Sequence, residues 1–136
     1  MDREQFLKEA QVTVLTTLGP DGAPHSAPMW YLYEGGVFKM ITGARSQKAR
    51  NVARRPQVSL VMDRRERPYY AVMIQGEAEV GPPPTPEFRF RLVAHYLGEA
   101  GARAYVGENR TDGMALLIVR PTRLAEFPSR SGTARE

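Results

Sequence analysis

Apolar and polar side chains alternate along much of the chain, and this pattern predicts short β-strands. The alternation is most regular over residues 12–18 and 69–80, which are rich in β-branched and aromatic side chains. Turn sequences rich in glycine and proline separate the alternating segments. We therefore expect strands over 12–18, 24–33, 37–42, 57–63, 69–80 and 114–119, with a short extension at 124–127.

Apolar residues recur at helical spacing in three other segments. Asp2 and Ser46 are residue types that cap helix N-termini, and Pro86 is favoured in a first helical turn. Residues 99–113 show no clear pattern. The helices are expected over 3–10, 46–55 and 86–97.

About six strands and a few helices predict a mainly β fold with minor α content. The first three strands are joined by tight turns and should form a meander within a six-stranded, closed or nearly closed antiparallel barrel. Residues 1–127 would make up this single domain, followed by a flexible tail over 128–136. Several strands are apolar on both faces, so a helix or a second subunit must cover the outside. A homodimer is the expected assembly.

Composition narrows the function classes. The 136 residues are 42% hydrophobic and 25% charged, which is typical of a globular domain. There is no cysteine, which excludes disulfides and cysteine nucleophiles, and with two histidines we expect no metal site. The N-terminus has mixed charge and lacks the apolar stretch of a signal peptide, so we expect a cytoplasmic protein without membrane contact.

The net charge of +4 is concentrated in one segment. Residues 45–55 carry five cations and no acidic residue, so the remainder of the chain is close to neutral. A local focus of positive charge favours a small anionic ligand over a long polyanion. The alternative for this segment is a solvated basic helix.

Two of these cations, Arg45 and Lys48, flank the expected helix start at Ser46. Cations at this end oppose the helix dipole, whereas a bound anion would pair with them and with the free backbone amides. Thr42 ends the preceding strand and offers a hydroxyl to the same loop. The segment therefore predicts a phosphate site, although it contains neither a Walker sequence nor a dinucleotide-binding glycine fingerprint.

The order of several short motifs resembles a known family. They are the strand at 12–18, Asp21-Gly22-x-Pro24-His25, Met29-Trp30, Ser46-x-Lys48-x-x-Asn51 before Pro56, Val58-Ser59-Leu60 and Gly76-Glu77-Ala78. Together they are similar to the flavin-binding split barrels related to pyridoxamine 5'-phosphate oxidase. The likeness covers residues 12–80 and is greatest to short actinobacterial-type members that bind FMN or the deazaflavin F-420.

This resemblance implies a homodimer with two cofactors at the interface and an oxidoreductase that moves hydride to or from a small organic substrate. The cofactor phosphate would contact Thr42, Ser46 and Lys48, with Asn51 supporting the loop and Arg45 nearby. The ring system would contact Pro28, Met29 and Trp30.

No acid–base side chain is required by the sequence. His25 is the one candidate, because it lies in the strand near the expected site and titrates near neutral pH. A hydrogen-bonded strand histidine without a chemical role is the alternative interpretation.

Two other functions remain open from the sequence. Sixteen arginines against three lysines, with aromatics on nearby strands, are also compatible with a basic barrel that binds single-stranded nucleic acid. A cofactor-binding protein without turnover, acting as a carrier or sensor, is the other alternative.

Overall fold

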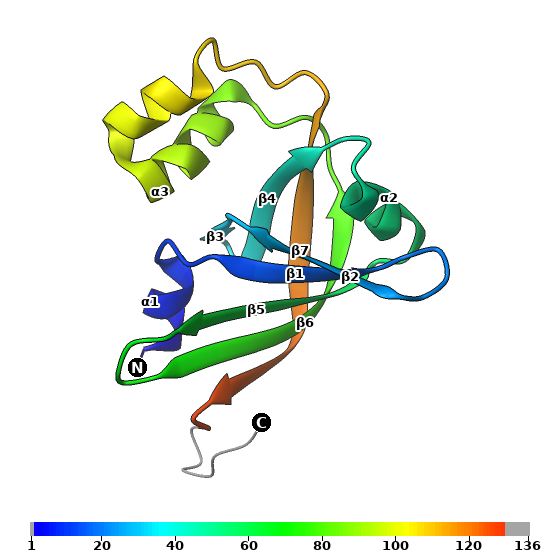
Figure 1. Cartoon of the computed structure of the whole chain (residues 1–136), viewed down its shortest axis with the longest axis vertical. Helices are drawn as coiled ribbons and strands as arrows, with labels where there is room; N and C mark the ends of the chain where they lie inside the picture. Colours follow the sequence, from blue (N-terminus) through cyan, green and yellow to red (C-terminus); the bar gives the residue numbers. More distant parts are fainter. Residues whose placement is uncertain (1, 130–136) are drawn as a thin grey trace.

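The computed structural model describes residues 2–129, and its dominant feature is one curled antiparallel sheet of seven strands (Figure 1). The strand order across the sheet is β2-β1-β5-β6-β7-β4-β3. The elements in chain order are α1 (Arg3–Lys8), β1 (Thr13–Leu18), β2 (Pro24–Met29), β3 (Leu32–Glu34), β4 (Val37–Gly43), α2 (Gln47–Arg54), β5 (Gln57–Arg64), β6 (Tyr70–Val80), α3 (Pro86–Val106) and β7 (Met114–Phe127).

The two edge strands of this sheet are consecutive in the chain. Only Trp30 and Tyr31 separate β2 from β3, although β2 pairs with β1 at one edge and β3 pairs with β4 at the other. A two-residue link can join opposite edges only if the sheet curls until those edges meet. The sheet is therefore a barrel split along the line between β2 and β3.

The prediction of one strand over 24–33 is thus wrong, and so is the meander of the first three strands. The chain leaves β2 at Trp30, where the backbone amide of Tyr31 donates to the hydroxyl oxygen of Tyr96 (3.0 Å) instead of to a neighbouring strand. The Tyr96 hydroxyl donates to the carbonyl oxygen of Gln11 (2.7 Å), with the Tyr31 carbonyl at 3.1 Å. The Tyr31 hydroxyl donates to the carbonyl oxygen of Leu7 (2.9 Å). Both phenols therefore hold the crossing in place.

The mainly β, antiparallel split-barrel fold is confirmed, with seven strands instead of six because the expected strand over 24–33 divides. Residues 114–127 form one continuous strand and not a strand with a short extension. Most of the expected flexible tail, residues 130–136, lies outside the described residues.

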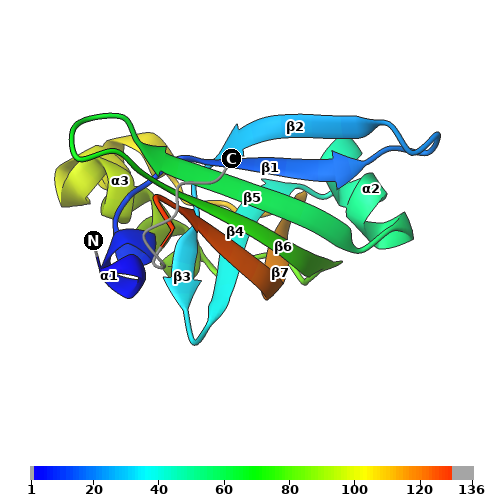
Figure 2. The same ribbon diagram turned by 90° about the horizontal axis from the view of Figure 1, so that it is seen from below.

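Side chains from the concave face of the sheet form the main core, and α1 and α2 close its two ends (Figure 2). Phe6 of α1 packs edge-on against Tyr70, with ring centroids 4.9 Å apart. Ala49 and Val52 of α2 are buried at the opposite end. The predicted caps are confirmed: the Asp2 side chain accepts from the amides of Glu4 and Gln5, and Ser46 caps α2.

The third helix differs from its prediction in two ways. It does not end near Leu97 but breaks at Gly98 (φ 79°) and continues to Val106 through the stretch that showed no pattern. Its buried face includes Phe88, Leu92 and Val93, while Leu97 is 44% exposed. In the described part of the chain, no helix combines the length and the apolar character that crossing a membrane requires.

The convex face of the sheet carries an uncharged row of side chains at its centre. Strand pairing aligns one residue from each of five adjacent strands, namely Pro28, Val14, Val61, Met73 and Ala125. We call these five the outer row. Val14 and Val61 are 40% and 39% exposed, whereas their chain neighbours Leu15 and Leu60 are buried in the core.

A close approach of two strand backbones at Gly76 allows a stability prediction. An added Cβ at Gly76 would lie 2.7 Å from the Arg120 carbonyl oxygen, at a register shift between β6 and β7. We expect Gly76→Ala to lower the free energy of unfolding by about 1–3 kcal/mol, because the backbones must move apart. Urea denaturation measures the loss. Gly43→Ala is the control, since its Cβ would meet nothing nearer than the Ser46 Cβ at 4.0 Å; an equal loss in both variants would contradict the prediction.

The phenol at the crossing generates a pH prediction. Burial raises the pKa of Tyr96 from its ordinary value to about 12. Between pH 10 and that value the unfolded chain has released the proton and the folded chain still holds it, so stability falls as the pH rises. Tyr96→Phe should be less stable than the wild type at neutral pH. Its free energy of unfolding should also fall less steeply with rising pH over this range, by up to about 1.4 kcal/mol per pH unit, because the proton of Tyr96 no longer contributes. Urea denaturation across this range tests it, with the exposed Tyr69→Phe as the control that should keep the wild-type slope.

Candidate functional site

The turn from β4 into α2 forms the first half of the candidate site. The Ala44 amide donates to the Gly113 carbonyl oxygen (2.8 Å), and the Ser46 amide donates to the Gly43 carbonyl oxygen (3.0 Å). The first bond fixes the turn against the start of β7, and the second closes the turn itself. Two of the predicted residues, Thr42 and Ser46, are brought together here, with their hydroxyl oxygens 3.0 Å apart.

Ser46 is engaged in capping α2. Its hydroxyl accepts from the Ala49 amide (3.2 Å), so this donor of the first helical turn is satisfied. The amides of Gln47 and Lys48, in contrast, have no hydrogen-bond acceptor within residues 2–129. Two backbone donors at the N-terminus of α2 therefore remain available to an anion.

Asn51 anchors α2 to the barrel. It is 1% exposed, its side-chain amide donates to the Thr17 hydroxyl (3.0 Å), and its oxygen accepts from the Gln47 side chain (2.6 Å). With these contacts Asn51 faces the protein interior and holds the helix start in position. Its predicted role in supporting a cofactor-binding loop stays a prediction.

The five cations of residues 45–55 have different surroundings. Arg50 donates to the Arg45 carbonyl oxygen, and Arg55 donates to the carbonyl oxygens of Gly19 and Pro20. None of the five forms an ion pair among the described residues; Arg45 and Lys48 are the two that flank Ser46, and the first turn of α2 has no acidic residue. The turn is therefore an electropositive cradle with two unpaired cations and two free amides.

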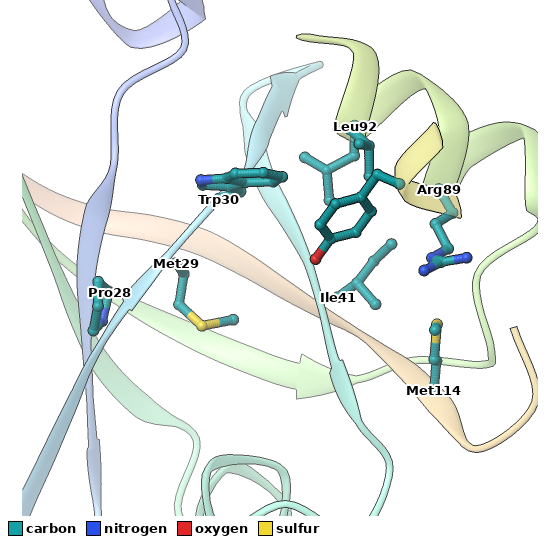
Figure 3. Close-up of a pocket in the computed structure, with 9 residues that line it drawn as sticks. Pro28, Met29, Trp30, Ile41, Arg89, Leu92 and Met114 are labelled. Atoms are coloured by element: carbon teal, nitrogen blue, oxygen red, sulfur yellow. The ribbon is translucent and has the colours of Figure 1, made fainter. Parts of the chain in front are cut away.

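A pocket forms the second half of the candidate site (Figure 3). It has a volume of about 330 Å³ and lies between α3 and the strands beneath it. Trp30 forms one wall, and its ring stacks on Tyr96 with centroids 4.7 Å apart and 6° between planes. The residues that line the pocket are Pro28, Met29, Trp30, Ile41, Arg89, Leu92, Val93, Tyr105 and Met114.

The cradle and the pocket are adjacent. Gly43, at the start of the cradle, pairs with Met114, which lines the pocket. Ile41 lines the pocket from β4, and the next residue, Thr42, faces the opposite side toward Ser46. The structure thus brings the residues expected near the ring system and those expected near the phosphate to one end of β4.

The contribution of α3 to the pocket was not predicted from the sequence. This helix supplies Arg89, Leu92, Val93 and Tyr105 to the pocket, and Tyr105 comes from the half-helix that follows Gly98. Helical spacing identified the first half of α3, but no local pattern shows which strands a helix will cover. Tyr105 has a large exposed ring, which indicates a binding surface only when its neighbours in space are known.

His25 is not brought to this site. It lies on the edge strand β2, is exposed, and pairs across the sheet with Thr17 instead of lining the pocket. A second basic loop, which contains Arg64, Arg65 and Arg67, is also exposed and lies at the β5–β6 connection.

The geometry suits a ligand with an anionic end and a flat, apolar body. The cradle supplies positive charge and backbone donors, and the pocket supplies aromatic and aliphatic walls. No group of three or more metal-ligating side chains occurs within residues 2–129.

Comparison with known proteins agrees with this architecture. An F420 reductase has a TM-score of 0.74 and 26% sequence identity, over 90% of this chain and 94% of its own. A conserved hypothetical protein from Mycobacterium tuberculosis has a TM-score of 0.72 and 25% identity, over 93% and 83% of the two chains. The heme storage protein HutZ from Vibrio cholerae has a TM-score of 0.68 and 18% identity, over 90% of each chain, which is a likeness of fold alone.

No curated protein sequence matches the chain. The sequence profile described as pyridoxamine 5'-phosphate oxidase, however, matches residues 3–127, which is nearly the whole length. With the split barrel and its cradle, this match identifies the chain as a member of the pyridoxamine 5'-phosphate oxidase family.

Proposed function

We propose that this protein is an oxidoreductase that binds a flavin-type cofactor, FMN or F-420, through the cradle at the start of α2. The observation that carries the proposal is the pair of unpaired cations, Arg45 and Lys48, beside two free helix amides and next to an aromatic pocket. The similarity to an F420 reductase at 26% identity supports the same class of cofactor.

The residues present fit such a cofactor. The amides of Gln47 and Lys48, the Lys48 ammonium and the Arg45 guanidinium would hold the phosphate, with Thr42 and Ser46 shaping the turn. Pro28, Met29 and Trp30 would lie against the ring system. When bound, the cofactor supplies the hydride chemistry, and the chain supplies position, charge and exclusion of water.

Heme is a less suitable occupant of this pocket. Neither His25 nor His95 lines it, so the histidine that most often holds heme iron is not supplied there, although the lining includes methionines and Tyr105. A carrier or sensor that binds the same flavin without turnover would use the same cradle, and assays with reductants and acceptors distinguish it from an enzyme.

The proposed assembly is a homodimer formed by the outer row. Five uncharged side chains in register across five strands provide a surface that can pack against its own copy about a two-fold axis. Pro28 belongs both to this row and to the pocket lining. A partner packed on the row would therefore lie beside the ring site and shield it from water.

Lys48→Ala tests the cradle. Loss of one charge-assisted contact should weaken binding of FMN or F-420 by about 1–3 kcal/mol, or about 5- to 150-fold in Kd. Titration followed by cofactor fluorescence measures this. Lys8→Ala removes an exposed lysine from α1 and should leave Kd unchanged. Equal Kd values for wild type and Lys48→Ala would contradict the placement of the phosphate in the cradle. Failure of both cofactors to bind the wild type would refute the proposed function.

Val61→Arg tests the assembly. It places a charge at the centre of the outer row, where burial against a second copy would cost several kcal/mol. We expect a dimer for the wild type and a monomer for the variant, as measured by analytical ultracentrifugation. Leu97→Arg, at a similarly exposed apolar position on α3, should stay dimeric. A wild-type monomer, or a dimeric Val61→Arg variant, would contradict this assembly.

A further inference from the structure

Among the described residues, Arg89 has no acidic partner, although the other two arginines of α3 do. Arg91 pairs with Glu34, and Arg103 pairs with Glu99 across one helical turn. Within residues 2–129 Arg89 forms no ion pair, and it is the one charged residue in the pocket lining. No acidic side chain in the described part of the chain therefore pairs with its positive charge.

The guanidinium of Arg89 is nevertheless held in place. One of its nitrogens, Nη1, donates weakly to the Val106 carbonyl oxygen and to the Asn109 side-chain oxygen, both at 3.4 Å. The group lies 6.0 Å from the centroid of the Tyr105 ring, and the Asn109 side chain itself donates to the Pro86 carbonyl oxygen (2.7 Å). An arginine has five N–H donors, so most of the donor fork remains available toward the cavity.

The surroundings of Arg89 are otherwise apolar. Figure 3 shows its side chain reaching from α3 toward the cavity, with Leu92 beside it and Ile41 and Met114 below. Trp30 and Tyr105 add aromatic surface, and no carboxylate lines the pocket. A single oriented cation in an apolar cavity selects a ligand with one compact anionic group.

We propose that this pocket binds a small organic carboxylate with an apolar, aromatic body, and that Arg89 recognises the carboxylate. The planar fork of an arginine matches a carboxylate with two parallel hydrogen bonds. A phosphate ester would bring a second negative charge for which the lining has no cation. That this ligand is the substrate of the flavin reaction rests on the proposed function; that it binds does not.

The experiment uses the cofactor-free protein and three probes of the same size class: phenylpropanoate, phenylpropanamide and phenyl phosphate. Calorimetry gives Kd, and fluorescence places the ligand, because Trp30 is the one tryptophan of the chain and stands in the pocket wall. The variants are Arg89→Gln, Arg89→Lys and, as a matched control on the same helix, Arg103→Gln.

We expect phenylpropanoate to bind, to change Trp30 emission, and to bind about 10- to 100-fold more tightly than the amide. Arg89→Gln should remove that difference while binding the amide as the wild type does, and Arg103→Gln should preserve it. Arg89→Lys keeps the charge but lacks the planar guanidinium, so its preference for the acid over the amide should be smaller than that of the wild type and larger than that of Arg89→Gln. This variant keeps the test valid if Arg89→Gln does not fold.

The proposal is overturned if phenylpropanoate does not bind, if acid and amide bind equally, if Arg89→Gln weakens phenyl phosphate as much as phenylpropanoate, or if both Arg89 variants retain the wild-type Kd. Flavin titrations of the same samples report on the proposed function separately. Carboxylate binding without flavin binding would refute the flavin function and leave the Arg89 site standing. Flavin binding without carboxylate binding would do the reverse.

Discussion

The two-residue crossing at Trp30 and Tyr31 is the constraint on which the rest of the molecule depends. It joins the two edges of the sheet, so the curl of all seven strands must bring those edges together. The Tyr31 amide would be left without a strand partner at this point, and the Tyr96 hydroxyl accepts its hydrogen bond. Because a buried unpaired amide costs about 1–3 kcal/mol, this one contact ties α3 to the split of the barrel.

The same contact builds the pocket. Tyr96 stacks on Trp30, which fixes the aromatic wall, and α3 then covers the convex side of β4 with Leu92 and Val93. On the other side of β4, the bond between Asn51 and Thr17 sets the position of α2. The cradle and the pocket are thus two consequences of how helices close a curled sheet, and they meet where β4 ends.

Much of the cradle could be predicted from sequence because its parts are close in the chain. A strand end, a capping serine and nearby cations lie within residues 42–51, and capping and helix-dipole effects act over one turn. The placement of α3 could not be predicted in the same way. Arg89 and Tyr105 face each other only because the chain reverses at Gly98, and nothing local to either residue indicates what the helix covers.

The sequence by itself determined the fold class, the strand and helix types, the helix caps and the position of the positive charge, since periodicity, capping and charge are properties of neighbouring residues. Only the tertiary structure decided that residues 24–33 divide between two sheet edges, that α3 covers the pocket, and that Arg89 lies unpaired within it. These features depend on contacts such as that of Tyr31 with Tyr96, 65 positions apart in the chain. Such contacts form only when the barrel has closed, so the local spacing of residues in the sequence does not predict them.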